Sequence, residues 1–136
     1  MRAALVGLAL VLISLTACDG DDDSTPTVEM LDGAVFKSSA VEGHEMVAGT
    51  SLRIEFDGDG IAANAGCNTL FGEIEITGGA LLVGPMAQTL IGCSDDLIEQ
   101  DQLLVQFLES GPAIRLERDT LTITGDGTSI TAEKIE

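Results

Sequence analysis

Short stretches in which apolar and polar residues alternate recur along the chain from residue 28 to residue 136. In the segment 51–56, Leu52, Ile54 and Phe56 fall on one side of an extended chain, and charged residues fall on the other. This alternation is typical of a β-strand that buries one face. The same pattern, bounded by Gly-rich turns, predicts strands at residues 34–39, 61–64, 70–77, 80–83, 86–91, 113–118, 121–124 and 129–134.

One segment follows a helical period instead. Between residues 95 and 109, Leu97, Leu104 and Leu108 recur at spacings that place them on one face of an α-helix. Asp96 is expected to cap the start of this helix, as part of a capping-box-like pair with a glutamate in the following turn. A Gly-Pro pair shortly after the segment is a stop signal. The pattern therefore predicts a helix over residues 95–109.

The predicted elements indicate a mainly β domain. About seven or eight short strands, joined by tight turns such as Asp57–Gly60, together with one helix favour a small antiparallel barrel or a strongly curled sheet. Closing the sheet into a barrel removes the exposed edges that strands otherwise leave open. The helix is expected to cover one open end or one face. Residues 28–136 are long enough to bury a core of their own.

The first residues of the chain have a different pattern. Residues 1–17 contain one charge, Arg2, followed by an unbroken apolar run that is too short to span a bilayer as a helix. This order is typical of a secretory signal peptide. Its end, Leu15–Cys18, resembles the lipobox of bacterial lipoproteins, which implies cleavage before Cys18 and a lipid on the Cys18 thiol. A plain cleaved signal, or an N-terminal membrane anchor with Cys18 incidental, is the alternative.

Residues 18–27 separate this leader from the predicted domain. After Cys18 they are acidic and polar, and nothing in them favours packing into a core. We therefore expect a flexible tether between the lipid and the folded domain. The expected organisation is a signal peptide at 1–17, a lipidated Cys18 with its tether at 18–27, and one domain at 28–136.

The charge of the chain excludes several partners. Its 136 residues include 6 basic and 23 acidic side chains, which give a formal net charge of −17. Because nucleic acids are recognised through a basic face, we expect no nucleic-acid partner. The same charge opposes adsorption to anionic lipid headgroups, so membrane attachment would depend on the lipid at Cys18. With 45% hydrophobic residues, the chain is nevertheless not a disordered acidic polymer.

Two cysteines lie inside the predicted domain. If Cys18 carries a lipid, Cys67 and Cys93 remain as a pair, and export would place them in an oxidising compartment. A disulfide between them is one interpretation, and two buried free thiols are the other. A catalytic pair is disfavoured because the spacing is not that of a Cys-x-x-Cys motif.

These cysteines also belong to a set of motifs that carries a family resemblance. The succession of Gly66–Asn68, Gly72, Gly84–Thr89 and Cys93 resembles the META-domain family of HslJ-type bacterial heat-shock lipoproteins. A helix rich in Glu and Gln and a Leu-Thr-Ile-Thr stretch follow in the same order, so the resemblance covers about residues 31–134. It implies a compact, mainly β, barrel-like domain with a packed helix. It implies no known reaction, because the family is linked to envelope stress and drug tolerance without an established enzyme chemistry.

Four residues of these motifs, Gly66, Asn68, Gly72 and Thr89, are interpreted mainly as structural. Gly66 can adopt a positive φ, and Asn68 can bond its side chain to nearby backbone. The functional alternative is that Asn68 and Thr89 line a binding mouth.

No residue is assigned a catalytic role. His44 is the single histidine of the chain and lies in a stretch expected to be a solvated loop, with no Gly-x-Ser-x-Gly elbow in the sequence and no metal-ligand spacing around it. Acidic pairs such as Glu73 and Glu75 are typical of the solvent-exposed face of a strand. We therefore expect no enzyme, no metal and no cofactor.

The sequence as a whole predicts a lipid-anchored protein on the extracytoplasmic side of a bacterial membrane. We expect a non-enzymatic binding or stress-protective module of the cell envelope, for which an envelope protein is a candidate partner. One alternative is a small apolar-ligand binder that uses the barrel mouth, which predicts a cavity lined by several strands. The other is a glycan-active enzyme, which predicts two carboxylates facing each other in a cleft.

Overall fold

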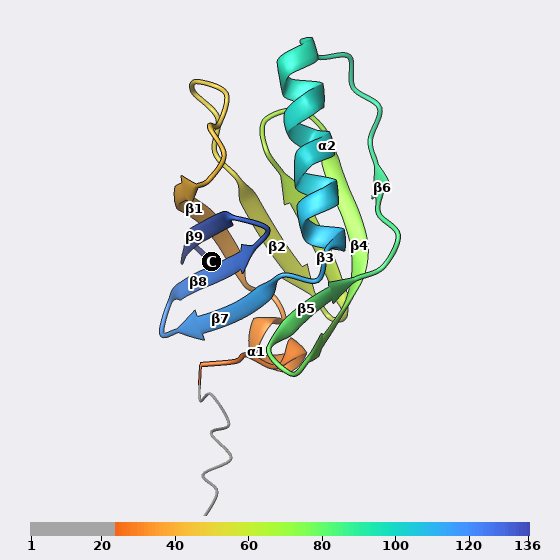
Figure 1. Cartoon of the computed structure of the whole chain (residues 1–136). Helices are drawn as coiled ribbons and strands as arrows, with labels where there is room; N and C mark the ends of the chain where they lie inside the picture. Colours follow the sequence, from red (N-terminus) through yellow and green to blue (C-terminus); the bar gives the residue numbers. More distant parts are fainter. Residues whose placement is uncertain (1–23) are drawn as a thin grey trace, which may run out of the picture.

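Tight turns divide the described part of the chain, residues 24–136 of a computed structural model, into nine strands and two helices (Figure 1). The helices are α1 (Val28–Leu31) and α2 (Asp95–Glu109). The strands are β1 (Val35–Glu42), β2 (Arg53–Asp57), β3 (Gly60–Asn64), β4 (Thr69–Thr77), β5 (Ala80–Val83), β6 (Ala87–Gln88), β7 (Ala113–Glu117), β8 (Thr120–Gly125) and β9 (Thr128–Lys134). The long helix has the bounds that its periodicity predicts.

Eight of the strands close into an antiparallel barrel. Each pairs with the next in the order β1-β2-β3-β4-β5-β7-β8-β9, and β9 pairs back with β1. The pairing between β5 and β7 is the shortest in the barrel, since it consists of the single residue pair Ala80 and Ala113. The ninth strand, β6, is an addition that pairs with β4. The prediction of a small antiparallel barrel with a packed helix is confirmed.

Strand β6 is shorter than its sequence pattern predicts. In the segment 86–91, only Ala87–Gln88 forms a ladder with β4. The alternation in 89–91 predicts a strand that does not form, because the Ile91 N–H donates to the side chain of Asn68, at 2.7 Å. Leu90, next to it, is 89% exposed.

The inner faces of the strands form a hydrophobic core. In β2, buried and exposed residues alternate, with Ile54 and Phe56 inside. Phe56 packs edge-on against Phe36 of β1, with ring centroids 6.0 Å apart. Within the described residues, this core extends from Leu31 to Ala132. Residues 24–136 therefore carry a core built from their own side chains, which is what a domain needs to fold by itself.

Helix α2 lies along the barrel, with β3 and β4 beside it and β5 near its C-terminal end (Figure 1). Leu104 and Leu108, which the helical period places on one face, are buried in the core together with Phe107. Leu103, at the flank of that face, is 38% exposed. The helix thus presents an apolar face to the barrel and one large apolar side chain beside it.

The expected N-terminal cap of α2 is wrong. The N-cap residue is Ser94, whose side chain makes no capping hydrogen bond, and Asp96 lies within the first turn. There its Oδ1 accepts from the Leu97 N–H at 3.0 Å. Hydrogen bonding from the Ser94 side chain lowers the pKa of the Asp96 carboxyl below its ordinary value. Asp96 contributes as a negative charge at the positive end of the helix dipole rather than as its cap.

The described chain begins on the side of the barrel that carries α1. Ser24 accepts a backbone hydrogen bond from Leu116 of β7, at 2.7 Å, and Pro26 is buried. Thr27 then caps α1 by accepting from the Met30 N–H, at 3.3 Å. A backbone hydrogen bond to Glu29, followed by one from the Thr27 side chain, lowers the pKa of the Glu29 carboxyl. Residues 24–27 of the expected tether therefore lie against the barrel.

The expected signal peptide and Cys18 lie outside the described residues. Within residues 24–136, neither helix has the length and apolar character that crossing a bilayer requires.

Candidate functional site

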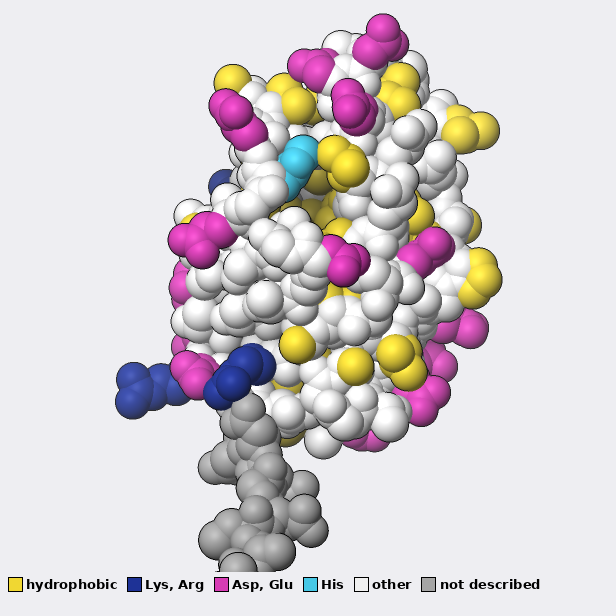
Figure 2. Space-filling model, viewed as in Figure 1, with side chains coloured by type: hydrophobic (Ala, Val, Ile, Leu, Met, Phe, Trp, Pro, Cys, Tyr) yellow, Lys and Arg dark blue, Asp and Glu magenta, His cyan; other side chains and the backbone are white. Residues whose placement is uncertain are grey.

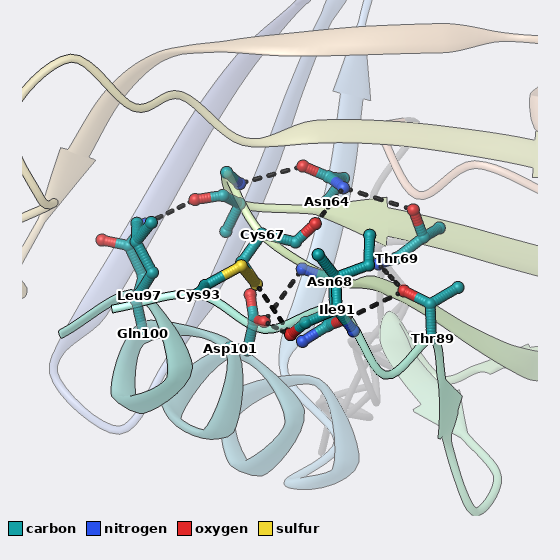
Figure 3. Close-up of a disulfide and its surroundings, with 12 residues drawn as sticks. Asn64, Cys67, Asn68, Thr69, Thr89, Ile91, Cys93, Leu97, Gln100 and Asp101 are labelled. Atoms are coloured by element: carbon teal, nitrogen blue, oxygen red, sulfur yellow. Dashed lines mark hydrogen bonds between the residues drawn. A yellow bond between two sulfur atoms is a disulfide. The ribbon is translucent and has the colours of Figure 1, made fainter. Parts of the chain in front are cut away.

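A disulfide joins the turn before β4 to the residues that lead into α2. Cys67 and Cys93 are bonded, with their Cα atoms 6.3 Å apart, so the disulfide interpretation of the cysteine pair is the correct one (Figure 3). The Cys67 side chain is 8% exposed. The bond fixes the start of the helix to the barrel wall across 26 residues of chain.

Asn68, the next residue, is the centre of a hydrogen-bond network (Figure 3). Its backbone N–H and its Nδ2 both donate to Oδ2 of Asp101 in α2, at 3.0 and 3.1 Å. Its Oδ1 accepts from the Thr89 hydroxyl at 3.1 Å and from the Ile91 N–H. Thr89 in turn accepts from the Thr69 N–H at 3.0 Å. The side chain, 6% exposed, is therefore committed to bonds within the protein.

Both motif glycines sit where a side chain would collide with a neighbour. Gly66 has a φ of +116°, and a Cβ on it would lie 2.8 Å from Cγ2 of Thr50. A Cβ on Gly72 would lie 2.8 Å from Cγ1 of Val83. Glycine is the residue that fits such close approaches without strain.

Gln100 of α2 is a second buried polar residue that holds the elements together, and the sequence analysis did not single it out. Its Oε1 accepts from the Val47 N–H at 2.7 Å. Its Nε2 donates to the Thr50 hydroxyl at 3.1 Å and to the Ala65 carbonyl at 2.5 Å. It thereby ties the loop between β1 and β2 to the helix. Its spacing from Leu104 places it on the buried helix face, and this was a signal available in the sequence.

A cleft of about 290 Å³ opens between this loop, helix α2 and the turn between β8 and β9. Its buried apolar lining residues come from the barrel and from the helix. They are Leu52, Ala65, Leu104, Phe107 and Ile130. The remaining lining residues are Val41, Gly43, His44, Met46, Gln100, Leu103, Gln106, Asp126 and Thr128. Figure 2 shows the hollow, with hydrophobic side chains at its base.

At the rim of the cleft, the backbone of the loop between β1 and β2 packs closely against the turn between β8 and β9. Gly43, with a φ of +83°, lies against the carbonyl of Gly127, where no side chain would fit. His44, expected to be a solvated loop residue, is half-buried and lines the cleft. Asn68 and Thr89 are not among the lining residues, so the cleft does not use the motif side chains.

The lining of the cleft contains two titratable side chains, those of His44 and Asp126. Asp126 is the one carboxylate among the lining residues, whereas a glycan-active site needs a facing pair. Within residues 24–136, the side chains of His44 and Asp126 have no hydrogen-bond or ion-pair partner. Across the same residues, no group of three or more His, Cys, Asp or Glu side chains could hold a metal ion. The geometry instead resembles a small-molecule binding site, concave and mostly apolar.

Comparisons with known proteins agree with this fold. A family model described as META domain matches residues 29–135. An NMR structure of a protein that is 24% identical covers 79% of this chain and 94% of its own, with a TM-score of 0.65. An NMR structure of a protein from Burkholderia xenovorans is 14% identical and covers 98% of both chains, with a TM-score of 0.63. At these identities, the two structures show the fold alone. No curated protein matches the sequence.

Proposed function

The chain belongs to the META domain family, and we propose that its barrel is a non-enzymatic binding module for small apolar or amphiphilic molecules, held at the cell envelope by a lipid on Cys18. Sequestering such molecules at the envelope is how the module would protect the cell.

The cleft is the observation that supports this proposal. Its volume of about 290 Å³ is close to the lower end, about 300 Å³, of the usual range for ligand pockets. An apolar-ligand binder at the barrel mouth predicts a cavity lined by several strands; here strands β1 and β9 contribute Val41, Thr128 and Ile130, and the loop between β1 and β2 and helix α2 contribute most of the rest. Phe107 and Leu104 contribute apolar surface from α2, and Leu52 and Ile130 contribute it from the barrel side.

The position of Ser24, the first described residue, also supports a binding protein that is anchored through its N-terminal side. The described chain starts at Ser24, beside β7 and near α1, at the lower end of the molecule in Figure 1. The loop between β1 and β2, which forms one wall of the cleft, stands at the opposite end. A protein attached through its N-terminal side would therefore hold the cleft away from the attachment point and open to solvent.

The lipid anchor has a direct test. In bacteria grown with an alkyne analogue of palmitate, the full chain should take up the label, and a Cys18→Ala variant should lose it, because the Cys18 thiol is the acceptor. A variant with Cys67→Ala and Cys93→Ala keeps Cys18 and should be labelled normally. Labelling of the Cys18→Ala protein would contradict the anchor.

The binding role predicts that residues 24–136 take up an apolar dye. N-phenylnaphthylamine, which fluoresces in apolar surroundings, should bind saturably with one site per chain. Leu103→Gln should weaken binding about fivefold, since loss of about 1 kcal/mol of apolar contact changes the dissociation constant by that factor. The measurement is a fluorescence titration of each variant.

Ile98→Gln is the matched control for this titration. Ile98 is on the same helix and is 36% exposed, close to the 38% of Leu103, but it does not line the cleft. We expect this variant to bind the dye like the original protein. Equal weakening by both substitutions, or a dye that gives no saturable signal, would rule the cleft out as the binding site.

A further inference from the structure

We infer that the cleft selects cationic amphiphiles, molecules with an apolar body and a positively charged head. This inference rests on the proposed function, because it takes the cleft to be a binding site and adds the charge of its ligand. Three observations carry it: the charge of the barrel, the side chains at the cleft's rim, and the positions of the basic residues.

The folded part of the chain is strongly acidic by itself. Four of the 23 acidic residues precede Ser24, so residues 24–136 hold 19 of them, against 5 of the 6 basic residues. The net charge of this part is therefore −14. Such an excess lowers the free energy of a cation near any part of the surface and raises that of an anion.

Acidic side chains at the rim, the outer edge of the cleft, add to this attraction of cations. The Asp126 carboxylate is part of the lining. Glu42 and Glu45, both exposed, flank the loop residues Gly43 and His44, which lie beside the turn that carries Asp126. In Figure 2, acidic side chains lie around the hollow. A positive head at this part of the rim would meet the Asp126 carboxylate, with those of Glu42 and Glu45 on the neighbouring loop.

The basic residues lie elsewhere. None of the lining residues within the described part of the chain is a lysine or an arginine. Arg53 lies 3.4 Å from Glu55, and Arg115 lies 3.7 Å from Glu117, so that two of the five positive charges are paired with carboxylates. In Figure 2, the visible Lys and Arg side chains lie at the left edge and the lower left, away from the hollow. An anionic head would find no basic side chain in the lining to bind.

The apolar base of the cleft would bind the hydrocarbon tail of such a ligand. Leu52, Ala65 and Ile130 are at most 3% exposed, so the cleft ends on closely packed hydrocarbon. Gln100 lines the cleft, but its amide is committed to Val47, Thr50 and Ala65. The tail of an amphiphile would therefore occupy the base, and its head would remain at the rim near Asp126.

Three amphiphiles with the same tail test the charge preference. Decyltrimethylammonium, decyl maltoside and decyl sulfate would each displace N-phenylnaphthylamine from residues 24–136, below their micellar concentrations and at low salt. We expect the cation to bind about tenfold more tightly than the neutral maltoside and the sulfate to bind most weakly, because like charges repel in this poorly screened setting. Added salt should narrow these differences.

Asp126→Asn isolates the contribution of the rim. Asp126 has a φ of +49°, a conformation that asparagine tolerates as well as aspartate, so the turn is retained. The variant should bind decyltrimethylammonium about threefold more weakly and reduce the ratio of cation to maltoside affinity. Asp119→Asn removes the same charge from the exposed turn between β7 and β8, outside the cleft, and should preserve that ratio.

The outcomes separate the two proposals. If decyl maltoside or decyl sulfate binds as tightly as the cation, the charge preference is overturned while the cleft stays a binding site. If none of the three displaces the dye, the proposed function fails together with this inference. The ranking of the three amphiphiles on the unmodified chain does not depend on any variant folding.

Discussion

Replacing Asn68 with alanine should destabilise the folded domain by about 3–5 kcal/mol. The side chain is buried and bonds to three residues, one in helix α2 and two in the segment 89–91. Its loss leaves the Ile91 N–H and the Thr89 hydroxyl without their acceptor, and it removes one of the two donors to Oδ2 of Asp101. Asp101 is 2% exposed, and loss of a hydrogen bond to a buried group costs about 1–3 kcal/mol, to which the two partly buried groups add smaller losses.

Urea unfolding of residues 24–136, followed by circular dichroism, would measure this loss. Asn64→Ala is the matched control, because Asn64, at the end of β3, makes the same chemical kinds of bond within the β3–β4 turn but is only half-buried. Water can replace its partners, so we expect a loss of about 1 kcal/mol there. An Asn68→Ala protein no less stable than the Asn64→Ala protein would show that the network contributes little.

Breaking the Cys67–Cys93 bond should cost about 3.5 kcal/mol, the loss of loop-closure entropy that the chain model assigns to a bridge across 26 residues. This is a large part of the stability of a small domain. The measurement compares urea unfolding of residues 24–136 with and without dithiothreitol, which should shift the midpoint to lower urea.

Two controls make the disulfide result specific. The Cys67→Ala/Cys93→Ala protein should unfold at the reduced protein's midpoint and should not respond to dithiothreitol. Thiol titration of the denatured, unreduced protein should detect no free thiol. Two titratable thiols per chain, with an unfolding curve indifferent to reductant, would refute the bond.

The hydrogen-bond network explains which parts of the fold the sequence could predict. The strands and the long helix follow from patterns within a few residues, and α2 begins and ends where the pattern puts it. The segment 89–91 departs from its pattern because its partner is the side chain of Asn68, remote in sequence. The cap of α2 departs because a helix that begins at Asp95 has residue 94 as its N-cap, which places Asp96 inside the first turn.

The residues of the candidate site were also predictable from the sequence only in part. The resemblance of short motifs pointed to Gly66, Asn68, Gly72 and Thr89, and these residues lie at close approaches or in the buried network. Neither Gln100 nor Asp101 was identified, because polar residues on a helix rich in Glu and Gln suggest a solvated face. Both are buried, since closure of the barrel brings the helix against the β3–β4 turn and its backbone donors and acceptors.

By itself, the sequence determined the alternation of strands, the single long helix, the acidity and the family resemblance, because each of these is a property of composition or of neighbouring residues. Only the tertiary structure decided that Cys67 bonds Cys93, that Asn68 meets Asp101, and that a cleft opens between α2 and two loops. The physical reason is that closing the barrel brings together residues from opposite ends of the chain. His44 and Asp126 are 82 positions apart (126 − 44) in the sequence, and they line one cleft because β1 pairs with β9.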